Sequence, residues 1–177
     1  MNHNYLVVMA GGIGSRFWPF SRNTSPKQFH DILGTGKSLL QQTIDRFESI
    51  CPIENIYVVG SQEHQELLRE QLPFLKQEQI LLEPYRRNTA PCVAFAAYKI
   101  FQKDPEANLV VAPADHIILK EKEFERLVLQ ALEESDKNEK LITLGIKPTR
   151  PDTGYGYIQF LETDSSIKKV KIFTEKP

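Results

Sequence analysis

Three glycines and two cations near the N-terminus have the types and spacing needed to hold a polyphosphate. Gly11, Gly12 and Gly14 follow an apolar run, and glycine lets the backbone approach a ligand closely with its N–H groups turned inward. Arg16 adds a planar guanidinium that fits two phosphate oxygens, and Lys27 adds a compact positive charge. The glycines alone also suit a tight turn between a strand and a helix, but with both cations present the pattern favours phosphate binding.

Two other phosphate-binding loops do not fit these residues. A dinucleotide-binding fingerprint needs a third glycine three residues after Gly14, where the chain has Phe17, and an acid at the end of the second expected strand, where it has Gly60. A P-loop motif would end at residues 36–38, Gly-Lys-Ser, but its first glycine falls on Asp31. Neither motif is present.

A second candidate segment is EPYRRNTAP, residues 83–91, which stands between an expected strand and an expected helix. We expect the nucleotide's base or ribose to bind here. The Asn88 amide offers both a donor and an acceptor to a purine edge, and Thr89 is suited to cap the helix. The alternative that Asn88 and Thr89 only cap the helix stays open. Arg87 is a weaker candidate for a contact with phosphate or base, because an exposed arginine is usually solvated.

A third candidate segment is PADH, residues 113–116, directly after an apolar strand. A carboxylate at the end of a strand beside a polyphosphate site is a natural ligand for Mg²⁺, so Asp115 is the candidate metal ligand. The alternative is a helix cap or a hydrogen-bonded turn. His116 could support the metal ligand from behind or simply pack, and we favour packing.

Composition limits the function classes. The 177 residues fit one compact domain, and 41% of them are hydrophobic. The net charge of −1 argues against a surface that binds nucleic acid, but leaves room for a small basic pocket. No apolar run is long enough to cross a membrane, and the N-terminus lacks the basic start of a signal peptide, so a cytoplasmic location is expected. Cys51 and Cys92 are expected to be buried, reduced thiols.

The elements that would position these residues alternate between strand and helix. Short, continuously apolar runs predict strands at 5–9, 56–59, 80–82, 109–112 and 141–144. Helical spacing of apolar residues predicts helices within 38–47, 61–72, 89–101 and 124–132, and Ser38 with Gln41 forms a capping-box pattern. This alternation predicts an α/β fold with a doubly wound, mostly parallel sheet flanked by helices, whose ligands bind beyond the carboxyl ends of the strands.

The C-terminal part has a different pattern. Residues 155–160 and 169–173 are predicted to form two more strands, after which the chain ends at TEKP. A strand without a covering element is an exposed edge. We therefore expect a single catalytic core, 1–177, that is the C-terminally truncated, N-terminal part of a longer chain, and exposed surface that favours self-association into a homo-oligomer.

The segment GGIGSRFWPFSRNTSPKQF, residues 11–29, resembles the nucleotidyltransferases that join nucleoside triphosphates to sugar 1-phosphates. Its variant is similar to the branch of mannose-1-phosphate guanylyltransferases, which typically read GSRLWPLSR and then PKQF. Phe17 and Phe20 stand where leucine is usual. The segment at 83–91 also matches this branch, and the resemblance extends through essentially the whole chain.

The resemblance implies roles for residues that the motifs alone do not assign. Arg16, Lys27 and Asp115 would be catalytic, with Mg²⁺ on Asp115. The nucleotide would be bound by Gly11, Gly12, Gly14, Ser15, Glu83, Asn88 and Thr89. The sugar phosphate would be bound by Gly145, Tyr155, Gly156, Glu175 and Lys176.

The reaction implied is transfer of GMP from GTP to mannose 1-phosphate, with these two as the expected small-molecule partners and no nucleic acid or membrane. Another sugar-nucleotide pyrophosphorylase, or a nucleotide-binding module without turnover, remains an alternative. Members of the family continue past the EKP motif with a second metal-binding aspartate. For this chain alone we therefore expect nucleotide binding with little turnover.

Overall fold

The computed structural model describes residues 3–12, 17–85, 87–138 and 140–176. The chain forms two compact units, residues 1–140 and residues 141–177. The single catalytic core over 1–177 stays a prediction. Among the described residues, no helix is both long enough and apolar enough to cross a membrane.

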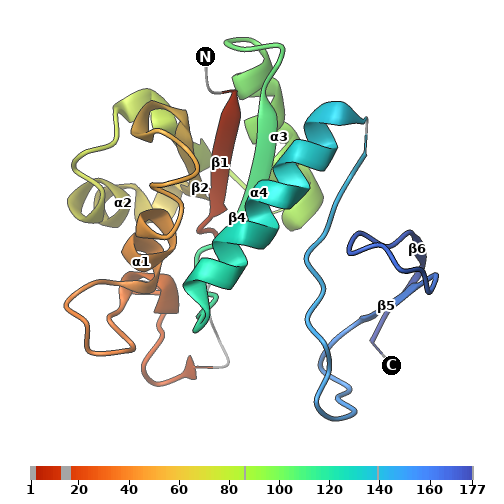
Figure 1. The fold of residues 1–177 in the computed structure, drawn as a ribbon. Coiled ribbons are helices and arrows are strands. Elements are labelled where there is room, and N and C mark those ends of the chain that lie inside the picture. The colour runs from red at the N-terminus through yellow and green to blue at the C-terminus, as the bar shows by residue number, and fades with distance from the viewer. Residues whose placement is uncertain (1–2, 13–16, 86, 139, 177) are drawn as a thin grey trace. The chain divides into compact units, whose positions relative to one another are not determined.

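The first unit contains a four-stranded parallel sheet (Figure 1). Its strands are β1 (Asn4–Met9), β2 (Ile56–Ser61), β3 (Ile80–Glu83) and β4 (Asn108–Pro113), in the order β3-β2-β1-β4. All three neighbouring pairs run parallel, as the continuously apolar runs predicted. Four of the five strands expected for this sheet are therefore confirmed.

Within the described residues, four α-helices connect or follow these strands. They are α1 (Leu39–Asp45), α2 (Gln65–Gln71), α3 (Thr89–Phe101) and α4 (Glu121–Lys137). Short 3-10 turns accompany them: η2 (Lys27–Phe29), η3 (Ile53–Asn55), η4 (Gln62–His64) and η5 (Gln77–Gln79). The capping box predicted for α1 is present, since the Ser38 side chain accepts from the Gln41 N–H and the Gln41 side chain accepts from the Ser38 N–H.

The helices cover both faces of the sheet because successive side chains of β1 point to opposite sides. Leu6 and Val8 are buried in one cluster with apolar residues of α1, α2 and α4. Tyr5 and Val7 are buried in a second cluster with residues of α3. Figure 1 shows α4 in front of the sheet and α3 behind it. The doubly wound, Rossmann-like fold is confirmed, and Cys51 and Cys92 are buried and unbonded as predicted.

The strand predicted at 141–144 is absent. Residues 141–144 have no regular secondary structure, and Leu141 is fully exposed. Apolarity alone does not make a strand, because a strand also needs a neighbour for its backbone N–H and C=O groups. In the described part of the chain, no strand pairs with this segment.

The second unit contains an antiparallel hairpin. Strands β5 (Tyr157–Phe160) and β6 (Val170–Thr174) pair with Tyr157 opposite Thr174, and the register shifts near Phe160. Both strands were predicted from the sequence to within two residues.

Candidate active site

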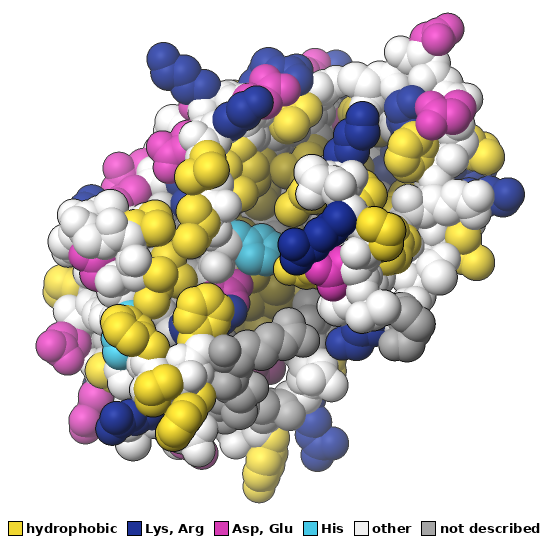
Figure 2. Space-filling model, turned by 90° about the horizontal axis from the view of Figure 1, so that it is seen from below, with side chains coloured by type: hydrophobic (Ala, Val, Ile, Leu, Met, Phe, Trp, Pro, Cys, Tyr) yellow, Lys and Arg dark blue, Asp and Glu magenta, His cyan; other side chains and the backbone are white. Residues whose placement is uncertain are grey.

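The loops that follow β1 and β4 start side by side at the carboxyl end of the sheet. Met9 is opposite Pro113 in the ladder, and the Ala114 N–H donates to the Met9 carbonyl at 3.0 Å. The glycine-rich loop therefore begins next to the segment that carries Asp115. Figure 2 views the molecule from this end and shows charged side chains of both signs around the face, with hydrophobic side chains between them.

Lys27 and Asp115, far apart in the sequence, form an ion pair at this end. The Lys27 Nζ lies 2.5 Å from the Asp115 Oδ2, and the two side chains are 24% and 28% exposed. Both predicted catalytic groups are thus brought together, and both remain accessible to a ligand. The ion pair places an ammonium, a group that can bind phosphate, directly beside a carboxylate, a group that can bind a metal ion.

Contacts with its neighbours fix the position of Lys27. Pro26 precedes the 3-10 turn that contains Lys27, and the Lys27 N–H donates to the Ser21 Oγ at 3.0 Å. The Lys27 ammonium also lies 5.2 Å from the centre of the Phe17 ring, which is close enough for a cation–π interaction. Phe17 therefore contributes more than the apolar character that it shares with leucine.

Glu83, at the end of β3, approaches the glycine-rich loop. A Cβ atom built on Gly11 would lie 3.7 Å from the Glu83 Oε2, so Glu83 and Gly11 are near neighbours. Burial raises the pKa of the Glu83 carboxyl above its ordinary value of 4.5. Burial and the nearby Glu83 charge together raise the pKa of the Cys92 thiol to about 11, which keeps this thiol protonated. The predicted nucleotide residues Gly11 and Glu83 are therefore close in space.

We expect the variant Glu83→Gln to be more stable than the wild type at neutral pH. The folded protein holds the Glu83 proton more tightly than the unfolded chain, so stability falls as the pH rises from 4.5 through the raised pKa. Glutamine keeps the shape and has no proton to lose. Urea unfolding at about pH 4 and about pH 7.5 measures the difference, which should appear only at the higher pH. If Glu83→Gln were less stable than the wild type by the same amount at both pH values, the raised pKa of Glu83 would not explain the effect.

The helix cap expected from Asn88 or Thr89 is wrong. Thr89 is the first residue inside α3 and is exposed, and Asn88 occupies the N-cap position without a side-chain cap hydrogen bond. Asn88 has a φ of 66° and a ψ of −165°, a conformation that costs energy for any residue with a Cβ atom. No side-chain cap bond offsets this strain, and the Asn88 side chain is exposed.

Asp115 and His116 both lie in the segment 113–116, at the end of β4. The N-cap of α4 is Lys120, so Asp115 does not cap that helix; Asp115 lies in a turn after β4. His116 is exposed, so the packing role predicted for it is wrong. The turn places His116 outside the sheet, where no apolar layer covers it.

Several predicted residues lie elsewhere. Gly14, Ser15 and Arg16 fall outside the described residues. The residues predicted to bind the sugar phosphate belong to the second unit: Gly145, Tyr155, Gly156, Glu175 and Lys176. Tyr155 is exposed, and a Cβ atom on Gly145 would meet nothing within 4 Å.

The hairpin brings three of these sugar-side residues together. A Cβ atom on Gly156 would lie 3.0 Å from the Thr174 carbonyl oxygen and 4.0 Å from backbone atoms of Glu175 and Lys176. Glycine is therefore needed at 156 for the two chain segments to approach. Glu175 and Lys176 are exposed at the end of β6.

Sequence reasoning missed one buried polar residue at the site, Gln28. It directly follows Lys27 and its carboxamide reaches carbonyl oxygens of the glycine-rich loop. The letters PKQF contain it, but only its burial distinguishes it from an ordinary surface glutamine.

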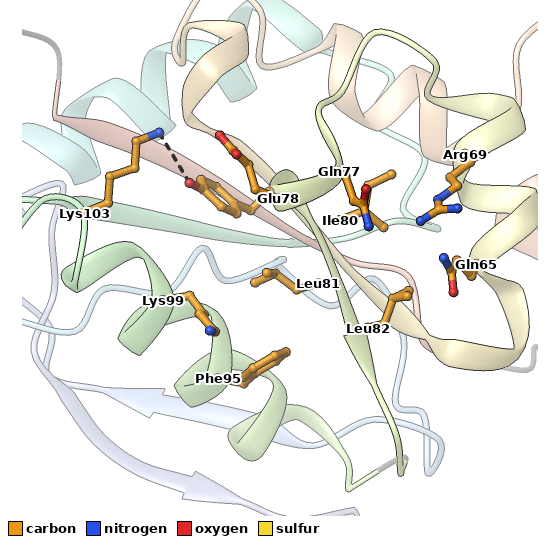
Figure 3. Close-up of a pocket in the computed structure, with 11 residues that line it drawn as sticks. Gln65, Arg69, Gln77, Glu78, Ile80, Leu81, Leu82, Phe95, Lys99 and Lys103 are labelled. Atoms are coloured by element: carbon orange, nitrogen blue, oxygen red, sulfur yellow. Dashed lines mark hydrogen bonds between the residues drawn. The ribbon is translucent and has the colours of Figure 1, made fainter.

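A surface cavity of about 440 Å³ lies away from these residues, beside the edge strand β3 (Figure 3). It is lined by apolar residues of β3, by Arg69 of α2 and Lys99 of α3, and by Lys103 and Glu78 outside these helices. The Lys103 Nζ lies 3.5 Å from the Tyr57 hydroxyl. Charged side chains beside an unpaired edge strand oppose pairing with another chain, which accounts for this cluster. Of the predicted site residues that the structure describes, none lines the cavity.

Comparison with known proteins decides the family. The family model described as nucleotidyl transferase matches residues 5–177. The chain belongs to the nucleotidyl transferase family.

Individual proteins with similar sequences or structures were also found. The chain is 44% identical to the mannose-1-phosphate guanylyltransferase RfbM of Salmonella typhimurium and 41% identical to a mannose-1-phosphate guanylyltransferase of Escherichia coli. Both alignments cover 97% of this chain but only 36% and 37% of those proteins. A solved structure from Thermus thermophilus, described as a mannose-1-phosphate geranyltransferase, matches with a TM-score of 0.89 and 32% identity, over 100% of this chain and 51% of its own.

Proposed function

We propose that this nucleotidyl transferase transfers GMP from GTP to α-D-mannose 1-phosphate, giving GDP-mannose and pyrophosphate. The observation that carries the proposal is the Lys27–Asp115 ion pair beside the glycine-rich loop. It offers both charges that a phosphoryl-transfer site needs, and the named relatives indicate which nucleotide and sugar to test first.

In the proposed reaction, a phosphate oxygen of mannose 1-phosphate attacks the α-phosphorus of GTP. The bond from that phosphorus to the bridging oxygen of the β-phosphate breaks, and pyrophosphate leaves with the electron pair. The nucleophile is already an anion at neutral pH, so no side chain has to remove a proton. Positioning and neutralisation of charge supply the rate.

The residues of the first unit would divide this work. The N–H groups of the glycine-rich loop and the guanidinium of Arg16 would bind the triphosphate and the charge that builds on pyrophosphate. Lys27 would neutralise the reacting phosphates. Glu83, Asn88 and Thr89 would bind the nucleoside, with Asn88 reading the purine edge.

Nucleotidyl transferases generally use a divalent metal ion. We propose Mg²⁺, with Asp115 as its protein ligand. Among the described residues, no three His, Cys, Asp or Glu side chains form a metal-binding group. A single accessible carboxylate fits Mg²⁺, which is commonly held by one or two carboxylates together with substrate phosphates and water. When bound, the ion would neutralise phosphate charge and align the reacting oxygens.

The sugar phosphate would be bound by the second unit. The Glu175 carboxylate would accept hydrogen bonds from sugar hydroxyls, and the Lys176 ammonium would neutralise the sugar's phosphate. The backbone near Gly145 and the segment with Tyr155 and Gly156 would form the wall of the pocket. A cytoplasmic location remains a prediction.

We expect a clear preference for GTP over ATP, UTP and dTTP when pyrophosphate release is measured with mannose 1-phosphate. A site built to hydrogen-bond one base leaves polar groups unpaired with another, so the difference in kcat/KM should be at least about tenfold. The assay should use the full-length protein and a panel of sugar 1-phosphates.

The outcomes separate the alternatives. Highest kcat/KM with UTP or dTTP, or with another sugar 1-phosphate, would assign the chain to a different sugar-nucleotide synthesis. Tight GTP binding without pyrophosphate release from any sugar phosphate would make it a nucleotide-binding module. Neither result would alter the family.

A further inference from the structure

A buried glutamine beside Lys27 holds the glycine-rich loop through two hydrogen bonds. The Gln28 Nε2 donates to the Ala10 carbonyl at 2.7 Å and to the Gly12 carbonyl at 2.9 Å. Gln28 is only 2% exposed. Because carbonyl oxygens only accept hydrogen bonds, the NH₂ end of the side chain must face them.

These two bonds restrain a loop that has little conformational preference of its own. Glycine adopts many backbone conformations, so consecutive glycines do not select one. The carbonyl and N–H of a trans peptide point in opposite directions, so fixing the Ala10 carbonyl also fixes the direction of the Gly11 N–H. Gln28 thereby sets the orientation of a backbone donor in the loop without occupying the space in front of it.

The same turn links the loop to the cation. Lys27, Gln28 and Phe29 form η2, and Phe29 is buried in the larger core cluster. The Phe29 carbonyl accepts from the Gln71 Nε2 at 2.8 Å, which ties the turn to α2. The turn is therefore anchored in the core, while the side chains of Lys27 and Gln28 reach the ion pair and the loop respectively.

We propose that Gln28 is a positioning residue that orders residues 10–12, the start of the glycine-rich loop, for the nucleotide's phosphates before the nucleotide binds. It acts through the backbone of the loop and touches no substrate. A loop that is already ordered loses less conformational freedom on binding, which increases affinity. The inference rests on the proposed function, because it requires the loop to bind phosphate.

Gln79 offers a control of the same chemistry. Its Nε2 also donates to two backbone carbonyls, Ile53 at 2.7 Å and Ile56 at 2.8 Å, and it is 3% exposed. It lies in the 3-10 turn η5, and Ile56 is the first residue of β2, at the opposite end of the sheet from the site. Gln79→Met also removes the acceptor of the Lys76 N–H, so its cost in stability should be at least as large as that of Gln28→Met.

The experiment measures calorimetric binding of GTP with Mg²⁺, thermal unfolding, and NMR order parameters of the Gly11 and Gly12 backbone amides without nucleotide. Gln28→Met should weaken GTP binding at least about tenfold and lower the order parameters of both amides. Gln79→Met should keep the Kd for GTP within about twofold of the wild-type value, since it acts at a distant, independent position. It should lower the unfolding midpoint at least as much as Gln28→Met does.

Each outcome decides a different point. Equal GTP affinity of Gln28→Met and wild type, or an equal loss of affinity in both variants, would overturn the role of Gln28. Absence of GTP binding by the wild type would instead overturn the proposed function. If Gln28→Met does not fold, Gln28→Asn replaces it. This variant keeps the amide but is too short to reach both carbonyls, and it should show the same loss of affinity.

Discussion

The variant Asp115→Asn is expected to lose at least about a hundredfold in turnover, because even residues that only support metal ligands cost 10–100-fold when they are replaced. Asparagine keeps the shape of Asp115 but removes the charge that attracts a hard cation. The Mg²⁺-dependent part of GTP binding should shrink as well. Pyrophosphate release and GTP calorimetry over a range of Mg²⁺ concentrations measure both effects.

Asp45→Asn is a suitable control for this experiment. Asp45 forms an ion pair with Lys37 at 2.7 Å, on a part of the first unit that contains no proposed site residue. It should leave turnover and its Mg²⁺ dependence unchanged. Wild-type Mg²⁺ dependence in Asp115→Asn would mean that another residue is the metal ligand.

The second large effect is expected for Lys27→Ala. A charge-assisted hydrogen bond to phosphate contributes roughly 1.5–3 kcal/mol, so kcat/KM for GTP should fall by about one to two orders of magnitude. The fold should be retained, because an ion pair with this exposure contributes only about 0–1 kcal/mol to stability. Steady-state kinetics and urea unfolding, run on the same preparations, separate the two quantities.

Lys37→Ala removes the other partner of the control ion pair and should leave kcat/KM unchanged. A second comparison uses the double variant Lys27→Ala with Asp115→Asn. If both residues act on the same phosphates, their effects on turnover should be far from additive. Full additivity would place Lys27 and Asp115 in separate steps.

The parallel sheet could be predicted because burial on both faces leaves a direct trace in the sequence. In β1, the run Tyr5, Leu6, Val7 and Val8 is continuously apolar since its side chains enter two different cores. The strand predicted at 141–144 is absent for a related reason. An apolar run of the same kind does not reveal whether a neighbouring strand is present to pair with it.

The candidate site was predictable only in part. Lys27 and Asp115 were identified separately by their motifs, but nothing in the spacing of the two residues indicates a direct ion pair. Gln28 could not be identified, because a glutamine that bonds two carbonyls inside the protein has the same letter as one on the surface. The cap at Asn88 failed since sequence preference at an N-cap does not anticipate a positive φ.

The division of the chain into two units has a consequence for how such enzymes diversify. The residues proposed for the nucleotide lie within the parallel sheet and its loops, and those proposed for the sugar lie in the segment that contains the β5–β6 hairpin. In the described part of the chain, the two sheets share no strand, so backbone pairing in one does not depend on the other. On the proposed assignment, mutations in the hairpin would change the sugar preference without altering a strand of the parallel sheet. Chimeras that exchange residues 141–177 between relatives are a practical way to recombine sugar and base preferences.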